Sequence, residues 1–456
     1  MAASMVSSSP PKVGMVSLGC AKNLVDAEIM LGAAIKMGFH ITPNAAEADI
    51  IVVNTCGFID SAKQESIDAI LTARQYPSQK LVVSGCLAQR HRDELAKELP
   101  EVDAFMVLDD VPRAGEIFTK LLSKSDSNHE LEILKGRSRY IPDYDTPRFR
   151  LTPPHTAYVK IAEGCNHPCS FCVIPQMRGR HRSRTISSVR QEVQGLVDAG
   201  VREINLISQD TTYFGMDQWA MKPGPKQPVD ASRGPTLIDL LDELGQIEGQ
   251  FWIRLLYTHP AHWSDDLIAA IARNPRVARY VDMPLQHIHS DMLVTMRRET
   301  SRQHIEDLVI RLRNGIPGLA IRTTFIVGFP GETEEHFESL LDFIESVRFE
   351  RLGVFKYSQE DGSRAAKMDG QLPDKVKNAR MRKAMTLQQR IAKELALSQV
   401  GSRLRVLPDS PLVARTEHDA PDVDCRVLLT EEVVTGDFVE VEVTGARVYD
   451  LIASPV

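Results

Sequence analysis

The sequence predicts an α/β protein with an N-terminal parallel α/β sheet domain, a central partial (β/α)6 barrel of the TIM type and a small C-terminal β-barrel of OB-like size. Two stretches in which apolar, β-like runs alternate with segments of helical periodicity predict the first two domains. Short strands separated by turns predict the third domain. We expect these domains at residues 1–125, 155–385 and 386–456, with a linker at 126–154.

Three strand–helix pairs predict the N-terminal domain. Each strand is a short apolar run, as expected for parallel strands that are buried on both faces and joined by right-handed crossovers. The strands are expected at residues 13–18, 49–54 and 81–84, and the helices at residues 23–37, 61–74 and 90–99. The segment 123–154 is charged and rich in Pro and Ser, which predicts a linker that runs along the surface.

Six further strands with helices between them predict the central barrel, because this number of β/α repeats fits an incomplete TIM-like barrel. The strands are expected at residues 157–161, 203–207, 252–257, 280–283, 321–327 and 353–357. The helices are expected at residues 188–199, 237–244, 265–272, 303–314 and 334–347. A Gly- and Pro-rich insertion at 221–235 predicts a surface loop, and one long helix is expected at 374–399.

The C-terminal segment carries most of the net charge of the chain. The net charge is −7 in total, and from Gly401 onward 5 basic residues stand against 11 acidic ones. A small acidic domain has little affinity for phosphate backbones and is better suited to a basic protein surface. We therefore expect this domain not to bind nucleic acid directly, and its acidic residues to favour a basic protein partner.

Composition and cysteine usage indicate a soluble protein of a reducing compartment. Hydrophobic residues make up 43% and charged residues 25%, and no apolar run is long enough to span a membrane. The first 11 residues lack the basic and apolar regions of a signal peptide. Seven cysteines, three of them in one tight group, argue against a secreted disulfide framework. We expect a cytoplasmic protein without a membrane partner.

Three cysteines of the central domain form what we call the claw. Cys165, Cys169 and Cys172 have the spacing C-x3-C-x2-C directly after the first barrel strand, and active sites of such barrels lie at the C-terminal ends of strands. Three thiolates on a four-iron cluster leave one iron open to a reactant. The alternative is a structural zinc site that recruits His167 or His181 as a fourth ligand. We favour the cluster, because structural zinc closes its coordination shell whereas reactive metal sites keep a position open.

Three other cysteines, which we call the trio, come one or two residues after the strands of the first domain. In an open parallel sheet the positions of Cys20, Cys56 and Cys86 share one edge, where ligands bind. Helix N-termini follow them, and helix dipoles favour thiolates. Each cysteine alone could be a buried packing residue, but three equivalent positions predict a second cluster with three protein ligands. Cys425 has no partner cysteine, and we expect it to be a packing residue or a silent thiol.

The claw, at this position in the chain, resembles the radical S-adenosylmethionine superfamily. Together with the trio and a small β-barrel like the TRAM modules, it is similar to the methylthiotransferases of that superfamily over nearly the whole chain. Within them the sequence looks like the RimO type, which modifies an aspartate of a small-subunit ribosomal protein. The runs that carry this resemblance are residues 18–26, 166–168, 283–287 and 419–424. Ala21 departs from the proline common in that type, without consequence for the central residues.

The resemblance implies radical chemistry with two 4Fe–4S clusters and S-adenosyl-L-methionine. At the claw, S-adenosylmethionine would bind the open iron and yield a 5′-deoxyadenosyl radical, while the trio would hold an exogenous sulfur that a second S-adenosylmethionine methylates. The radical would remove hydrogen from the β-carbon of an aspartate in ribosomal protein S-twelve, free or within the ribosome, and the carbon would capture the methylthio group. An electron donor protein is also implied. The alternative is the same chemistry on a tRNA adenosine, as in the MiaB type. A non-enzymatic iron–sulfur carrier is disfavoured because it does not need a six-repeat barrel.

Residues at the ends of barrel strands are predicted to contact S-adenosylmethionine. Gln209 and Asp210 would meet its amino group, and Gln286 and His287 its ribose, although a strand-end turn or a satisfied core histidine would also explain them. Gly328 would let the backbone approach the adenine. One or two of the arginines after the claw would hold the methionine carboxylate, and the others would lie in a solvated loop. These arginines are Arg178, Arg180, Arg182 and Arg184.

Overall fold

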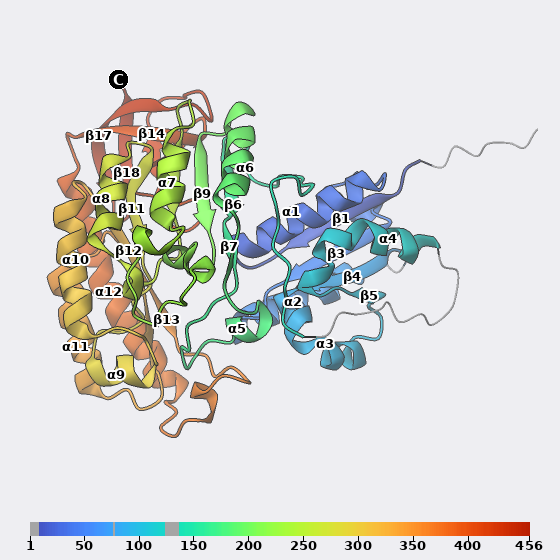
Figure 1. Ribbon diagram of the computed structural model, residues 1–456, viewed down its shortest axis with the longest axis horizontal. Helices are drawn as coiled ribbons and strands as arrows, with labels where there is room; N and C mark the ends of the chain where they lie inside the picture. Colours follow the sequence, from blue (N-terminus) through green and yellow to red (C-terminus); the bar gives the residue numbers. More distant parts are fainter. Residues whose placement is uncertain (1–8, 76–77, 124–135) are drawn as a thin grey trace, which may run out of the picture. The chain divides into compact units, whose positions relative to one another are not determined.

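The computed structural model describes residues 9–75, 78–123 and 136–456. The chain forms two compact units (Figure 1). The first unit consists of the described parts of Met1–Leu151 together with Val173–Gly179, and the second of Thr152–Cys172 and Arg180–Val456. The segment Val173–Gly179, which directly follows the claw, therefore belongs to the first unit. Among the described residues, no helix combines the length and the apolar character needed to cross a membrane.

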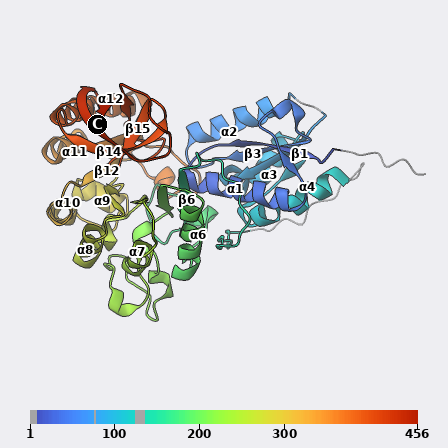
Figure 2. The same ribbon diagram turned by 90° about the horizontal axis from the view of Figure 1, so that it is seen from above.

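The first unit is built on a five-stranded parallel sheet in the order β2-β1-β3-β4-β5. Figure 2 shows α2 on one side of this sheet and α1 and α4 on the other. The strands are β1 (Lys12–Ser17), β2 (His40–Ile41), β3 (Ile50–Thr55), β4 (Lys80–Gly85) and β5 (Ala104–Phe105). The helices are α1 (Ala21–Lys36), α2 (Asp60–Ala73), α3 (Cys86–Glu98), α4 (Ala114–Ser123) and α5 (Ile174–Met177).

The strand order of this sheet reverses between β1 and β3, and such a switch point is where open parallel sheets bind ligands. The central strand β3 buries all six of its residues, as its apolar sequence predicts. Its one buried amide, Asn54, donates a 2.7 Å hydrogen bond to the backbone oxygen of Asn23. Helix α1 begins after Cys20, and Gly38, with a φ of 89°, lies just beyond its end.

Gly85, between β4 and α3, sets how closely two strand ends approach each other. Its φ is 93°, and a Cβ at this position would lie 2.4 Å from the backbone oxygen of Thr55. Gly85→Ala should lower the free energy of unfolding of this unit by about 2–3 kcal/mol, because left-handed strain and a backbone clash act together. Urea denaturation measures this loss.

Gly38→Ala is the matched control, since Gly38 has a φ of 89° and its added Cβ would meet nothing within 4 Å. This substitution should lower the free energy of unfolding by only about 1 kcal/mol, from strain alone. Equal losses for the two variants would show that the close approach at Gly85 contributes nothing.

The described part of the predicted linker forms no helix or strand between residues 136 and 154, and its residues 147–151 lie against α1. The buried carboxylate of Glu28 in α1 accepts hydrogen bonds from Arg148 Nε at 2.6 Å and from the backbone nitrogen of Leu151 at 2.7 Å. A Cβ on Gly32 of α1 would lie 2.4 Å from the backbone oxygen of Pro147. The segment is therefore tied closely to the helix that follows Cys20.

The second unit contains a six-stranded sheet in the order β13-β12-β11-β10-β9-β6, and all of its strand pairs are parallel. In Figure 2, the helices that connect these strands follow one another along their outer side. The strands are β6 (Thr156–Lys160), β9 (Glu203–Ile207), β10 (Trp252–Leu255), β11 (Val277–Asp282), β12 (Ala320–Val327) and β13 (Arg351–Lys356). The helices are α6 (Ile186–Asp198), α7 (Leu237–Gly245), α8 (Asp265–Arg273), α9 (Ser290–Thr295), α10 (Arg302–Gly315) and α11 (Glu334–Val347). The predicted fold class, including the open six-repeat barrel, is confirmed.

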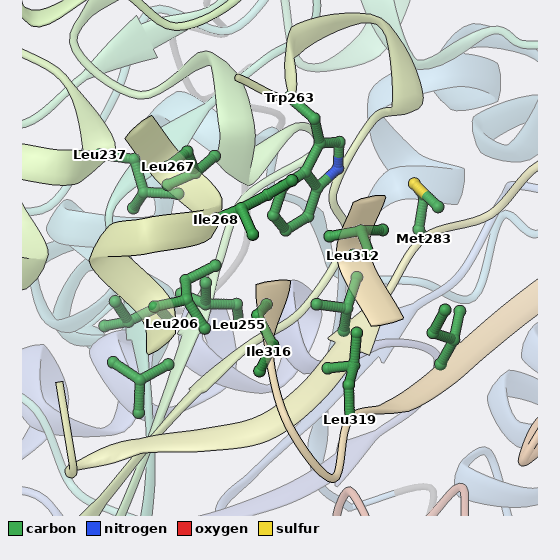
Figure 3. Close-up of a cluster of buried hydrophobic side chains, with 14 of the residues drawn as sticks. Leu206, Leu237, Leu255, Trp263, Leu267, Ile268, Met283, Leu312, Ile316 and Leu319 are labelled. Carbon is green, nitrogen blue, oxygen red and sulfur yellow. The ribbon is translucent and has the colours of Figure 1, made fainter. Parts of the chain in front are cut away.

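The core of this unit lies between the sheet and its outer helices (Figure 3). Trp263 is 1% exposed and packs among leucines and isoleucines of α8 and α10, while Leu206 and Leu255 contribute from the strands. This apolar layer holds the strands in place, so that the residues after their C-terminal ends form one face. The claw lies at that end of β6, after the short strand β7 (Ala162–Glu163), which pairs with β8 (Arg182–Ser183).

The long helix α12 (Asp374–Ser398) leads into a closed barrel in the order β14-β15-β16-β18-β17. Its strands are β14 (Arg403–Ser410), β15 (Val413–Thr416), β16 (Val427–Leu429), β17 (Val439–Arg447) and β18 (Asp450–Pro455). The predicted boundary between residues 385 and 386 falls inside α12. Val406, Val427 and Val441 fill the small core of this C-terminal barrel.

Buried ion pairs fix the C-terminal barrel to the beginnings of the central strands. Glu203, the first residue of β9, is fully buried and lies 2.8 Å from Arg254 of β10 and 2.7 Å from Arg415 of β15. Burial raises the pKa of Glu203, but the two arginines outweigh this effect and lower it overall. The C-terminal barrel therefore lies at the end of the central barrel opposite to the claw.

Two acidic residues of the C-terminal barrel belong to the same interface. Asp419 pairs with Arg351 at 2.5 Å, and Asp424 pairs with Arg322 at 3.3 Å and accepts a hydrogen bond from Tyr280 at 2.6 Å. The expectation that the acidic residues of this segment face a basic partner therefore has to be corrected for Asp419 and Asp424. Their negative charge is compensated by arginines inside the unit, and Asp409 and Asp437 of the same segment are also paired there, with Arg415 and Arg202.

Candidate functional site

Backbone contacts hold the claw in a defined loop within the second unit. Ser170, between two of its cysteines, donates hydrogen bonds from its backbone nitrogen to Met296 O and from Oγ to Thr295 O, both at 2.9 Å. Its own backbone oxygen accepts from the nitrogen of Ala365 at 2.8 Å. All three claw cysteines are partly exposed, so a bound group would remain accessible to a reactant.

The pKa values of the claw thiols indicate what kind of group these thiols can bind. Burial, together with the neighbouring Cys172 and Cys169, raises the pKa of Cys165 well above its usual value. Three adjacent thiolates are stable only when a cation compensates their charge, and metal binding supplies that charge while it removes the protons. The donor set therefore fits an iron–sulfur cluster with three protein ligands.

His167, within the claw, is clamped between two carboxylates. Its Nε2 lies 2.7 Å from Asp210 Oδ2 and its Nδ1 lies 2.5 Å from Glu299 Oε2. Burial lowers the pKa of His167, but the bonds to Asp210 and Glu299 outweigh burial and raise it to about 9. The ring is then a cation that donates from both nitrogens, which leaves it no lone pair for a metal. This arrangement argues against His167 as the fourth ligand of a zinc site.

Two further histidines, which the sequence analysis did not single out, surround His167. His259 stacks on its ring with centroids 3.7 Å apart, and His262 lies 5.2 Å away, with Nε2 3.5 Å from Asp210 Oδ2. Both follow the C-terminal end of β10, the same kind of position that identified Asp210 after β9. Strand-end position alone could have found them, although histidine at such a position has many structural uses.

Gln209 and Asp210 both form hydrogen bonds within the second unit. Gln209 Nε2 donates to Glu163 Oε1 at 2.5 Å, and Glu163 is also paired with Lys160 at 2.8 Å. Asp210 is 2% exposed and accepts from His167 and from Thr212 Oγ1. These bonds place both residues beside the claw, and their contact with the amino group of S-adenosylmethionine stays a prediction.

The other predicted S-adenosylmethionine residues lie at the same end of the barrel, with structural roles of their own. Gln286 adopts a φ of 75° and bridges to β12, and such left-handed strain outside glycine is concentrated at functional sites. His287 is fully buried and bonds Glu332 at 3.2 Å. Gly328, with a φ of 74°, is approached by Lys377, whose Cγ would lie 2.3 Å from an added Cβ. A role for these residues at the ribose and adenine stays a prediction.

The first unit brings the trio to one edge of its sheet, at the switch point between β1 and β3. Cys20 precedes α1, Cys56 follows β3 and Cys86 is the first residue of α3. Burial raises the pKa of Cys56 to about 12, with Cys86 and Cys20 adding to the effect. The pKa of Cys20 is lowered overall, because Lys22, Arg178 and backbone N–H groups at the start of α1 outweigh burial. A Cβ on Gly19, the neighbour of Cys20, would lie 3.2 Å from Cys56 Sγ, so the loops that carry these cysteines come close together.

Asn23, another residue that the sequence analysis did not single out, ties the loops of the trio together. Its Nδ2 donates to Leu18 O at 2.9 Å and to Thr55 O at 2.8 Å, just before Cys20 and Cys56. Its Oδ1 accepts from the thiol of Cys86 at 3.6 Å. One side chain in the first turn of α1 thus contacts all three strand ends.

The four arginines after the claw have different environments. Arg178 is 2% exposed and lies in the first unit beside Cys86, whereas Arg184 is buried in the second unit and bonds Glu192 and Ser188. Arg182 bonds the backbone oxygen of Arg180, which is itself exposed. Of the four, only Arg180 is exposed, as predicted for a solvated loop, and the contact of Arg178 with S-adenosylmethionine stays a prediction.

Cys425 lies apart from both groups, in the C-terminal barrel. Burial raises the pKa of its thiol to about 12, so it is protonated at neutral pH. This state agrees with the expected silent thiol.

Comparison with protein-family models divides the chain in the same order as its fold. Residues 12–107 match the uncharacterized protein family UPF0004, residues 159–344 match the radical SAM superfamily, and residues 400–456 match the TRAM domain. The claw thus lies within the radical SAM region, the trio within the UPF0004 region, and the closed C-terminal barrel within the TRAM region.

Curated relatives match over nearly the full length. Proteins named ribosomal protein uS12 methylthiotransferase RimO are 56% identical in Opitutus terrae, over 97% of this chain and 96% of theirs, and 53% identical in Akkermansia muciniphila, over 97% and 100%. The RimO protein of Desulforamulus reducens is 44% identical over 97% of this chain and 99% of its own.

Solved structures with a similar fold are more distant in sequence. The radical S-adenosylmethionine methyltransferase TsrM from Kitasatospora setae has a TM-score of 0.55 at 14% identity and covers 76% of this chain and 73% of its own. The cobalamin-dependent S-adenosylmethionine radical enzyme OxsB has a TM-score of 0.51 at 13% identity, over 82% and 56%. At these identities the likeness concerns the fold alone.

A three-thiolate claw at the strand ends of an open six-stranded barrel, within the region that matches the radical SAM superfamily, defines a radical S-adenosylmethionine enzyme, and its full-length relatives are named methylthiotransferases. The predicted enzyme class is therefore confirmed. With full-length identities of 44–56%, the chain belongs to the RimO family of ribosomal protein uS12 methylthiotransferases.

Proposed function

We propose that the protein transfers a methylthio group to the β-carbon of an aspartate in ribosomal protein uS12. The relatives that match this chain over nearly their whole length are named for this activity. The observation that carries the proposal is the presence of two separate sets of three cysteines, one at the strand ends of the barrel and one at the switch point of the parallel sheet. Each set lacks a fourth thiolate, so each leaves one position for a reactant.

At the claw, Cys165, Cys169 and Cys172 would hold a 4Fe–4S cluster whose open iron binds S-adenosylmethionine. Such a cluster, once reduced by an external electron donor, would supply the one-electron chemistry that makes an unactivated C–H reactive. The protein fixes the loop through Ser170 and through the clamp on His167.

At the trio, Cys20, Cys56 and Cys86 would hold a second 4Fe–4S cluster whose open iron carries the sulfur to be transferred. Asn23 ties together the loops that carry these cysteines, and the backbone N–H groups at the start of α1 favour the thiolate of Cys20. Both sets are proposed to serve one reaction, with hydrogen removal at the claw and sulfur capture at the trio.

Recognition of uS12 is proposed to use acidic residues of the TRAM region that are not paired within the unit. Glu431, Glu432 and Glu440 are exposed on this region, and ribosomal proteins are basic, so electrostatic steering would favour their encounter. An electron donor protein and a cytoplasmic location are further parts of the proposal.

Incubation of the reconstituted enzyme with uS12, S-adenosylmethionine, sulfide and a reductant tests the activity. We expect mass spectrometry to find one methylthio group in place of hydrogen on a single aspartate of uS12. Bulk tRNA in a parallel reaction should show no methylthio nucleoside, and its modification in place of uS12 would overturn the proposal. The variant Arg180→Met, at an exposed position of the second unit, should retain full activity and serves as the control.

A further inference from the structure

We propose that Arg178 is a positioning residue for the trio, which holds the sulfur of Cys86 and supplies permanent positive charge to the cluster that the trio binds. This inference rests on the second cluster of the proposed function. It assigns to Arg178 a role within the first unit, in place of a contact with S-adenosylmethionine.

Three contacts of the buried Arg178 guanidinium reach the surroundings of Cys86. Its Nη2 lies 3.1 Å from Asn23 Oδ1, 3.0 Å from Asp26 Oδ2 and 3.3 Å from Cys86 Sγ. The side chain is 2% exposed, and Asp26 and Asn23 are equally buried. Because an arginine in a protein does not lose its proton, the charge at this position is fixed.

The segment that carries Arg178 is anchored in the first unit. Val173 and Met177 pack in one apolar cluster with Cys86, and both are 1% exposed. Arg178 itself closes helix α5 with a 2.8 Å hydrogen bond to the backbone oxygen of Ile174. A short helix directly after the claw thus delivers a cation to the other cysteine set.

Asn23 links Arg178 to the rest of the trio. The oxygen that accepts from Arg178 also accepts from the thiol of Cys86, and the nitrogen of the same amide bonds the backbone before Cys20 and Cys56. A simple ion pair with Asp26 would need neither the approach to sulfur nor this shared amide. The geometry is therefore that of a residue that orients the ligands of a metal site through hydrogen bonds.

Two consequences for a bound cluster follow from this geometry. An N–H···S bond and a nearby positive charge stabilise the reduced, more negative state, so they raise the reduction potential. Orientation of the ligand sulfur raises the affinity for the metal, and loss of such outer contacts lowers metal affinity about 10- to 100-fold. Both effects should be confined to the trio.

The test uses the full-length, anaerobically reconstituted enzyme with the double substitution Arg178→Met and Asp26→Asn. Removing both charges avoids an unpaired buried aspartate, which would destabilise the fold by itself. At limiting iron, we expect the affinity of the trio for its cluster to fall about 10- to 100-fold. A redox titration followed by electron paramagnetic resonance should show a more negative midpoint potential for this cluster only.

The claw provides the internal reference, because its signal is identified by its response to S-adenosylmethionine. Arg180→Met, which removes an exposed arginine two residues along the chain, should change neither signal. Arg178→Lys keeps the charge without the planar fork and should restore part of the potential. Affinity and potential equal to those of the wild type in the double variant would overturn the role of Arg178, as would equal shifts of both clusters.

A separate outcome concerns the proposed function itself. Wild-type enzyme that binds about four irons per chain, in place of about eight, would remove the second cluster, and the role of Arg178 with it. Wild-type enzyme with about eight irons and a double variant that matches it in affinity and potential would overturn the role of Arg178 alone.

Discussion

Cys56→Ala is expected to abolish methylthio transfer while S-adenosylmethionine cleavage continues. The substitution removes one of three thiolates at the switch point, and two thiolates do not hold a four-iron cluster. The loop itself should persist, because Ser66 rather than the thiol fixes its backbone, through bonds of 2.9 Å and 3.0 Å to the nitrogen and oxygen of Cys56. We expect 5′-deoxyadenosine release close to that of the wild type, a fall of at least about 10³-fold in modified uS12 and about four irons per chain.

Two other cysteine variants give this prediction its contrast. Cys169→Ala should abolish cleavage and transfer together, since the claw is needed for both. Cys425→Ala is the matched control, because this thiol lies in the C-terminal barrel and is protonated at neutral pH. Methylthio transfer by the Cys56→Ala variant at the wild-type rate would refute the assignment of a second cluster to the trio.

Sequence patterns predicted the architecture closely because most elements have a strong local signal. Strand β3 starts with four apolar residues and is buried on both faces, and α12 was expected at 374–399 against an observed Asp374–Ser398. Strands β2 and β5 have only two residues each, too few to show any periodicity. Their formation depends on the neighbouring strands β1 and β4, which is tertiary information.

The cysteines of the candidate site could be predicted because topology alone brings strand ends together. The side chains that contact those cysteines could not be predicted from the sequence. Arg178 and Arg180 stand in the same basic run, yet one is buried beside Cys86 and the other is exposed, because helix α5 belongs to the first unit and the residues after Gly179 to the second. The chain enters the first unit directly after the claw and returns to the second unit after seven residues. No local sequence pattern marks either change.

Charge counting misjudged the C-terminal barrel for a similar reason. Composition shows an excess of acidic residues there, but it does not show that Asp419 and Asp424 pair with arginines of the central barrel. Asp422→Lys combined with Asp424→Lys would therefore be a poor test of partner docking, because the second change breaks a buried contact. Substitution of Glu431 and Glu432, which are exposed, tests docking without that complication.

Glu203→Gln is expected to loosen the C-terminal barrel from the central one by about 3–5 kcal/mol. The carboxylate is fully buried and is shared by Arg254 and Arg415, so its neutralisation leaves two buried guanidinium groups with too little negative charge. Gln has nearly the same shape, so the loss comes from charge and hydrogen bonding rather than from a cavity. Limited proteolysis at the end of α12, together with the thermal unfolding midpoint, measures the effect.

Glu345→Gln is the matched control for this prediction. Glu345 also pairs with an arginine, Arg390, at 2.6 Å, but both side chains are more than half exposed, at 54% and 55%. Solvent screens such a pair, and its loss should change stability by no more than about 1 kcal/mol.

Because the ion pairs of Glu203 lie at the beginnings of the strands and the claw lies beyond their ends, S-adenosylmethionine cleavage by folded Glu203→Gln enzyme should remain close to wild type. Loss of cleavage at a temperature where the TRAM region stays protease-resistant would mean that Glu203 acts on the claw, contrary to the assignment made from its place at the start of β9.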